Sequence, residues 1–196
     1  MENCPYQSPI SLCGKHSLNL QDNIINKLCG HNCGSIYDAE HKIYIVKDDI
    51  FLTSDNCKYR LYEYHFHTPA EHKINGNIYP GEIHYVFFKV GHKHNTSKII
   101  DVCGSSNNTT EEDILVIGYG LSDICNTINL NKMKIYIPSS YFLYDGSLTT
   151  PDFGPVRWIV SNKTLKVNID QLEDVSKLAR SLQHKNNRII LVHDKM

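Results

Sequence analysis

Short runs in which apolar and polar residues alternate recur along most of the chain, and they carry the first structural prediction. Tyr, Ile and Val recur within these runs, and alternation of this kind is typical of strands with one buried face. Gly, Asn, Asp and Pro separate the runs, as turns require. The expected strands span 42–46, 59–67, 83–90, 114–119, 134–137 and 156–160. The pattern therefore predicts a mostly β (α+β) protein.

One segment near the end of the chain has the spacing of a helix instead. Between positions 170 and 182 the apolar residues recur at intervals of three or four, which would line one face of a helix. Asn168 or Asp170 could cap its first turn. The residues on the apolar face are Leu172, Val175, Leu178, Ala179 and Leu182. The spacing predicts one helix over 170–182.

Length and composition limit the classes of protein and partner. A chain of 196 residues with 41% hydrophobic and 21% charged residues suits one globular domain, here taken as 1–196. The formal net charge of -1 gives no basic excess, so we expect neither a nucleic acid nor a membrane as partner. No apolar stretch is long enough to span a bilayer. A small-molecule ligand fits better, and the oligomeric state is left open.

Cysteine usage bears on the compartment. The chain has seven cysteines, at positions 4, 13, 29, 33, 57, 103 and 125, and the odd number favours free thiols over a complete disulfide framework. The N-terminus also lacks the basic and then apolar order of a signal peptide. We therefore expect a cytoplasmic protein. The role of Cys29 and Cys33, which flank a Gly-His-Asn tripeptide, is left open.

Three histidines have the spacing of a metal site. In the alternating stretch 64–67, His65 and His67 project from one face of a strand. The turn residues 75–77 lead into a second strand that carries His84, and antiparallel pairing would bring the third imidazole to the first two. Three neutral nitrogens leave tetrahedral zinc one open position, as catalytic sites require.

Two carboxylates accompany these histidines. Glu63 and Glu82 each precede a histidine by two positions and should share its face, where they could accept the hydrogen bond of its other ring nitrogen. A cupin is the alternative, because His65, His67 and Glu71 imitate a motif that binds iron or manganese. The glycines that frame the cupin motif are absent, yet spacing alone leaves both readings open.

Three sequence motifs of this chain resemble those of the α-class carbonic anhydrases, particularly the compact bacterial-like branch. The motifs are QSPI at 7–10, the stretch from YRL at 59 through HFHTPAEH to EIH at 84, and YDGSLTTP at 144–151 with VRW at 156–158. The resemblance covers about 7–188. It implies a single domain with a central, largely antiparallel twisted sheet, a few short surface helices, and a cleft that reaches the metal.

The resemblance also implies a reaction, the reversible hydration of carbon dioxide to bicarbonate and a proton by a zinc-bound hydroxide. His65, His67 and His84 would hold Zn²⁺. Thr149 and Glu71 would orient the hydroxide through a hydrogen-bond relay, and His41 would carry the proton to solvent.

Further residues receive roles from the same resemblance. Thr150 would contact bicarbonate, and an apolar wall for carbon dioxide would consist of Val86, Val116, Leu148 and Trp158. Asn186, within the stretch that resembles the family's ending, joins Glu63 and Glu82 as a residue supporting the ligands. The alternative is a catalytically weak member of the family that binds a glycan or protein. The intact zinc histidines argue against it.

Overall fold

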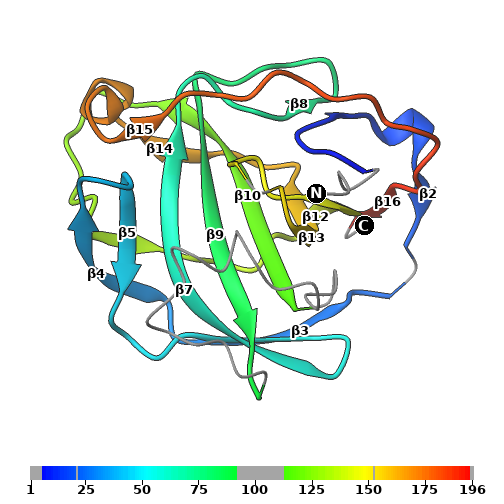
Figure 1. The fold of residues 1–196 in the computed structure, drawn as a ribbon, viewed down its shortest axis with the longest axis horizontal. Helices are drawn as coiled ribbons and strands as arrows, with labels where there is room; N and C mark the ends of the chain where they lie inside the picture. Colours follow the sequence, from blue (N-terminus) through cyan, green and yellow to red (C-terminus); the bar gives the residue numbers. More distant parts are fainter. Residues whose placement is uncertain (1–5, 21, 92–112, 152, 195–196) are drawn as a thin grey trace.

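The strands of the molecule join one large twisted sheet that contains the site. The computed structural model describes residues 6–20, 22–91, 113–151 and 153–194. The sheet has 14 strands among these residues, and its main path runs β11-β4-β5-β7-β9-β10-β13-β12-β16-β2 (Figure 1). Its longer strands are β4 (Asn32–Asp38), β7 (Cys57–His67), β9 (Gly81–Lys89), β10 (Ile114–Asp123), β12 (Ser140–Ser147) and β13 (Pro155–Ser161).

Shorter elements complete the sheet and its surroundings. The short strands are β2 (Leu18–Asn19), β3 (Ile25–Cys29), β5 (Ile43–Val46), β6 (Phe51–Ser54), β11 (Lys132–Lys134), β14 (Leu165–Val167), β15 (Ser176–Lys177) and β16 (Leu191–Asp194). β1 (Ser11–Leu12) and β8 (Lys73–Ile74) form a separate two-stranded sheet. In the described part of the chain the helical segments are the 3₁₀ turns η1 (Gly14–His16) and η3 (Ile169–Leu172).

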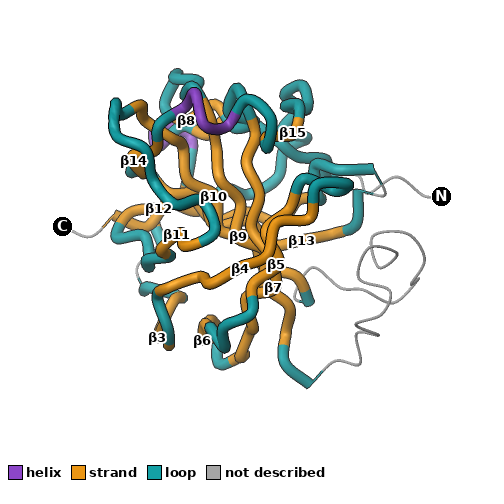
Figure 2. Tube along the Cα trace, turned by 90° about the vertical axis from the view of Figure 1, so that its left-hand side faces the viewer, coloured by secondary structure: helices purple, strands orange, loops and turns teal. Residues whose placement is uncertain are grey.

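The centre of the sheet is antiparallel. β7 pairs with β9 and β9 with β10, whereas β13 runs parallel to β10. Short helical turns at the surface account for very little of the chain (Figure 2). The predicted fold class, a largely antiparallel twisted sheet with few short helices, is therefore confirmed. Within the described residues no helix combines the length and apolar character that crossing a membrane would need.

Each face of the central strands packs into its own core. Alternate residues of β7 point to opposite faces, so Tyr64 and Phe66 enter one hydrophobic cluster with Tyr44 and Tyr85. The second cluster lies on the face that carries the histidines. Its members include Ile10, Val86, Val116, Phe142, Tyr144 and Trp158. The histidines thus lie beside an apolar layer and not at an open surface.

Most of the predicted strands are present, one is displaced, and several strands of the structure were not predicted, β4 and β12 being the longest of them. The run at 134–137 is wrong in its position, because β11 ends at Lys134. β12 escaped prediction because its residues are apolar on both faces and nearly all buried, so no alternation marks it.

The predicted helix over 170–182 is wrong. Asn168 does cap the start by accepting a hydrogen bond from the Asp170 amide at 3.0 Å, but the turn ends at Leu172. The chain then pairs with β7 through β15, in a parallel register that places Ser176 opposite Phe66. Leu178, predicted to be buried, is 91% exposed. Hydrogen bonding to a sheet edge has prevailed over helical periodicity.

Candidate metal centre

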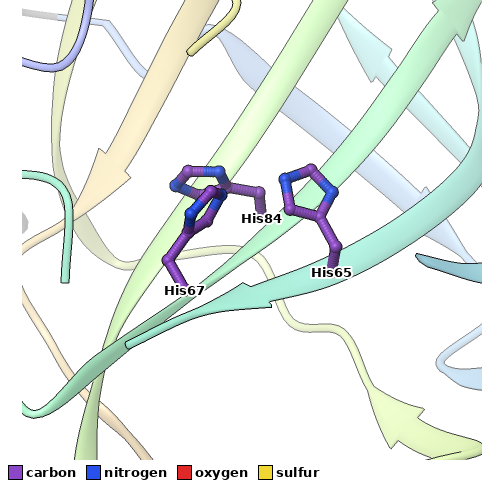
Figure 3. Close-up of side chains that lie close together, drawn as sticks. All are labelled: His65, His67 and His84. Atoms are coloured by element: carbon purple, nitrogen blue, oxygen red, sulfur yellow. The ribbon is translucent and has the colours of Figure 1, made fainter. Parts of the chain in front are cut away.

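Two neighbouring strands bring three imidazoles together. His65 and His67 lie on the same face of β7, and the register places His84 of β9 directly opposite His65. One ring nitrogen from each lies within 4.8 Å of the others, and the ring centroids are 4.8 to 5.2 Å apart. Figure 3 shows the three rings turned toward a common point. The predicted convergence is present.

One nitrogen of each ring is held by an oxygen acceptor. Nδ1 of His65 lies 3.0 Å from Oε1 of Glu63, and Nε2 of His84 lies 2.9 Å from Oε1 of Glu82. Nδ1 of His67 lies 3.3 Å from the carbonyl oxygen of Leu178. Because carboxylate and carbonyl oxygens only accept hydrogen bonds, these three nitrogens carry the protons.

The other nitrogens are left with lone pairs. They are Nε2 of His65, Nε2 of His67 and Nδ1 of His84, and Nε2 of His67 is buried without a hydrogen-bond partner among the described residues. A buried acceptor without a partner costs free energy unless something binds it. Three convergent imidazole lone pairs fit zinc, which accepts nitrogen ligands in tetrahedral sites.

Burial favours the neutral form of the His65 and His67 rings. His65, His67 and His84 are 6%, 1% and 1% exposed. Burial lowers the pKa of His65 and His67 well below the ordinary value, and the charge of Lys177 and the neighbouring His84 lower both further. Only neutral imidazole binds a metal, so the low pKa prepares the ligands for one.

Glu82 organises the far side of the centre. Its Oε1 accepts from His84 and, at 2.7 Å, from Nδ1 of His72, and its Oε2 accepts from the amides of Glu71 and His72 at 2.9 and 2.8 Å. Burial alone would raise the pKa of Glu82, but the charges and hydrogen bonds of His72 and His84 outweigh it and hold that pKa well below its usual range. A second group of possible metal donors, His72, Glu82 and His84, is thus already joined by hydrogen bonds.

Glycine at position 118 leaves room for this carboxylate. Gly118 of β10 pairs with His84, and a Cβ there would lie 3.0 Å from Oε1 of Glu82. His72 extends the network, since its Nε2 lies 2.6 Å from the hydroxyl of Tyr144. The orientation of His84 is therefore fixed by a chain of buried contacts.

Glu63 has a different environment. Burial raises the pKa of its carboxyl group, and the charge of Lys177 opposes that rise. Lys177 lies in β15, in register with His67, so its side chain leaves the sheet on the histidine face. Oε2 of Glu63 has no hydrogen-bond partner among the described residues. The acceptor for His65 is thus less constrained than the acceptor for His84.

Glu71 and Thr149 lie at the centre but do not form the predicted hydrogen bond. Oε1 of Glu71 accepts from the Arg180 amide at 2.8 Å, whereas its Oε2 is buried without a partner among the described residues. Thr149, 8% exposed, follows β12 in a loop. The loop places Thr149 near His65 and His84, and no hydrogen bond joins it to Glu71 among the described residues.

A small cavity opens beside the histidines. Its volume is about 10 Å³, about the room that one water molecule needs. His65 and His84 line one side. The remaining lining residues are Val86, Val116, Leu148, Thr149, Thr150 and Trp158. The structure therefore gathers at one cavity the four residues predicted for the apolar wall, together with Thr149 and Thr150.

His41 lies farther out, in the turn between β4 and β5. Its side chain is 33% exposed, and its Nδ1 lies 2.9 Å from Oδ2 of Asp38. Its charge is a minor influence that lowers the pKa of Glu63, whose main cause of shift is burial. Asp38 was not expected to contact it.

The segment after β15 supplies contacts that the sequence did not indicate. Leu178 provides the carbonyl for His67, and Arg180 provides the amide for Glu71. Asn186, predicted to support the ligands, is exposed in a turn with φ of 51°. The main-chain groups of Leu178 and Arg180 that contact His67 and Glu71 belong to no side-chain motif, so the sequence did not indicate them.

Comparison with known proteins gives consistent matches. The family model described as "Eukaryotic-type carbonic anhydrase" matches residues 3–194. A carbonic anhydrase of Pectobacterium carotovorum is 26% identical over 191 residues, covering 94% of this chain and 75% of that protein. Alpha carbonic anhydrase 7 of Arabidopsis thaliana is 26% identical over 201 residues, covering 94% and 73%.

A solved structure supports the fold. The Photobacterium profundum alpha-carbonic anhydrase aligns with a TM-score of 0.73 at 20% identity, covering 95% of this chain and 88% of that one. At that identity the likeness concerns the arrangement of the strands.

Proposed function

The chain belongs to the eukaryotic-type carbonic anhydrase family and is an enzyme of that kind, and we propose that it uses zinc held by His65, His67 and His84 to interconvert carbon dioxide and bicarbonate. The single observation that carries the proposal is the set of three convergent lone pairs, each on a ring whose other nitrogen donates to a fixed acceptor. Zinc bound there would act as a Lewis acid that lowers the pKa of water to roughly 7.

Glu71 and Thr149 are proposed to orient the oxygen nucleophile. Oε2 of Glu71 is a buried acceptor that receives no hydrogen bond from the described residues, and Thr149 supplies a hydroxyl at the neighbouring cavity. A donor from Thr149 would satisfy that oxygen, and the threonine oxygen could then accept only from the nucleophile. Such orientation speeds the reaction by aligning the reacting atoms.

The cavity wall is proposed to receive the substrate. Carbon dioxide is nonpolar, so Val86, Val116, Leu148 and Trp158 offer it contacts without competing for the metal. Thr150 lies at the same cavity and would contact bicarbonate. His41, partly exposed, would pass the released proton to buffer.

The organisation and location of the chain are also proposals. We propose one domain over 1–196, because a single sheet joins strands from β2 to β16. We propose a reducing compartment, the cytoplasm, because the five described cysteines are free thiols: Cys13, Cys29, Cys33, Cys57 and Cys125. Burial, with the charge of Asp48, raises the pKa of Cys33 to about 12, so this thiol stays protonated. Cys4 and Cys103 lie outside the described residues.

Metal content and turnover test the function together. We expect the wild type to bind one zinc and to accelerate hydration in a stopped-flow pH-indicator assay. His84→Ala should weaken zinc binding by more than the roughly 100-fold that loss of an outer contact costs. His31→Ala, which removes an exposed histidine, is the matched control. Zinc-loaded wild type without acceleration would refute the enzymatic proposal and favour a binding module.

A further inference from the structure

The turn that carries His41 is built around one carboxylate. Asp38 is the last residue of β4, and the turn returns to β5 at Ile43, its pairing partner. Oδ1 of Asp38 accepts from the amides of Glu40 and His41 at 3.0 and 3.3 Å. Oδ2 lies 2.9 Å from Nδ1 of His41. A single side chain therefore holds both the main chain of the turn and the imidazole ring.

The contact fixes the tautomer of the ring. The hydrogen bond from His41 is the main cause of a lowered pKa of Asp38, whose slight burial opposes that shift. An ionised carboxylate can only accept, so Nδ1 of His41 carries a proton. In the neutral ring Nε2 is then the free lone pair.

The turn is anchored next to the metal centre. Lys42 has a φ of 52°, and its Nζ donates to the carbonyl oxygen of Ser176 at 3.0 Å. Ser176 pairs with Phe66, the residue between His65 and His67. β4 pairs with β5, and β5 pairs with β7, in the same sheet (Figure 1). The ring of His41 is thus held on a turn that is itself tied to the ligand strand.

We propose that Asp38 is a positioning residue for proton transfer, which holds His41 in the Nδ1–H tautomer so that Nε2 takes up and releases the proton. This inference rests on the proposed function. A proton binds Nε2 to give the imidazolium, and the same N–H bond breaks when the proton passes to buffer. The Nδ1 proton stays on the ring, hydrogen-bonded to Asp38, throughout, so the ring need not flip between turnovers. The side chain of His41 is open enough to solvent for buffer to reach it.

Asp38→Asn tests the tautomer without removing the turn. The amide oxygen can still accept from the two main-chain amides, while the amide nitrogen donates toward Nδ1 of His41. Nδ1 must then accept, and the ring proton moves to Nε2. Long-range ¹⁵N–¹H spectra of the neutral ring, assigned with His41→Gln, should show Nδ1–H in the wild type and Nε2–H in Asp38→Asn. Unchanged tautomers would overturn the inference.

Oxygen-18 exchange tests the consequence for catalysis, because it separates interconversion of carbon dioxide and bicarbonate from the proton-dependent release of labelled water. We expect Asp38→Asn to slow only the release, by about ten-fold, a small part of what positioned proton transfer contributes. Imidazole buffer should restore it. Glu40→Gln, in the same turn, is the matched control and should match the wild type. In a His41→Ala background, Asp38→Asn should cause no further loss.

The outcomes separate this inference from the proposed function. Equal loss of interconversion and release in Asp38→Asn, or an effect that persists without His41, would reduce Asp38 to a structural role. If the wild type shows no interconversion, the proposed function fails, and the proton-transfer role with it. The spectra would still decide whether Asp38 sets the tautomer.

Discussion

The two faces of β7 are both buried, yet they are stabilised in different ways. On one face Tyr64 stacks against Tyr44 with ring centroids 5.0 Å apart and an interplanar angle of 2°, and Phe66 meets Tyr44 edge-on at 5.7 Å. On the other face His65 and His67 depend on directed hydrogen bonds to particular oxygens. The aromatic face needs shape and volume, whereas the histidine face needs acceptors at fixed positions.

The difference indicates that one face of β7 serves mainly the stability of the fold and the other serves mainly the metal centre. A one-residue step along the strand changes the environment, because successive side chains leave opposite faces. Substitutions on the aromatic face should therefore change the free energy of unfolding. Substitutions of the groups that accept hydrogen bonds from the histidines should change the affinity for zinc. The following expectations test that separation from the largest effect to the smallest.

Phe66→Ala should show the cost of breaking the aromatic face. Removing a fully buried ring is expected to lower the free energy of unfolding by about 3–5 kcal/mol, measured by urea denaturation. Zinc affinity of the folded protein should stay near the wild-type value. Phe66→Leu, which preserves most of the volume, should cost less than about 1.5 kcal/mol. A large loss of zinc affinity in the folded Phe66→Leu protein would contradict the separation of the faces.

Glu82→Gln should act mainly on the metal. Glu82 accepts four hydrogen bonds with two oxygens, whereas glutamine has only one oxygen acceptor. The variant therefore cannot hold both His72 and His84 and the two main-chain amides, and His84 loses its fixed orientation. We expect zinc affinity to fall about 10–100-fold, measured by competition with a chelator. Glu63→Gln should cost less, because its amide oxygen can still accept from Nδ1 of His65. Equal losses in the two variants would show that the two acceptors do not differ.

Acid should destabilise the metal-free protein through the histidine face. Burial lowers the pKa of His65 and His67 in the folded state, whereas unfolded histidine titrates near 6.5. Below about pH 6.5 the unfolded chain therefore binds more protons, and stability falls as pH decreases toward the folded pKa. Each histidine should cost about 1.4 kcal/mol at pH 5.5.

The contribution of one ring can be isolated by comparing urea midpoints at pH 7.5 and 5.5. Metal-free His67→Gln should lose part of the pH dependence of the wild type. A variant with the full dependence would mean that other groups cause the acid sensitivity.

Leu178→Ser should have the smallest effect. The contact to His67 comes from the main-chain carbonyl, and the side chain is 91% exposed. Stability should change by less than about 0.5 kcal/mol, and zinc affinity should remain unchanged by the same chelator competition. A clear loss of zinc would mean that the side chain itself fixes the carbonyl.

The part of the site that consists of side chains could be predicted from the sequence, whereas the part that consists of main-chain groups could not. Strand alternation and the family resemblance both depend on the types of the side chains. They were therefore sufficient to predict that His65, His67 and His84 converge and which residues lie around them. The Thr149–Glu71 hydrogen bond was predicted and is not formed, since its geometry depends on the loop after β12. Asp38 carried no expected role, although it lies three residues before His41, because a carboxylate in a turn usually serves the main chain alone.

What the sequence by itself determined is the set of groups on each face of each strand, because the two-residue period is a local property of the backbone. Only the tertiary structure decided which main-chain groups complete the centre. The carbonyl of Leu178 and the amide of Arg180 are the same chemical groups that every residue has, so no side-chain pattern could mark them. They reach the histidines because Ser176 and Lys177 pair with β7 and the segment does not form the helix that its periodicity favours.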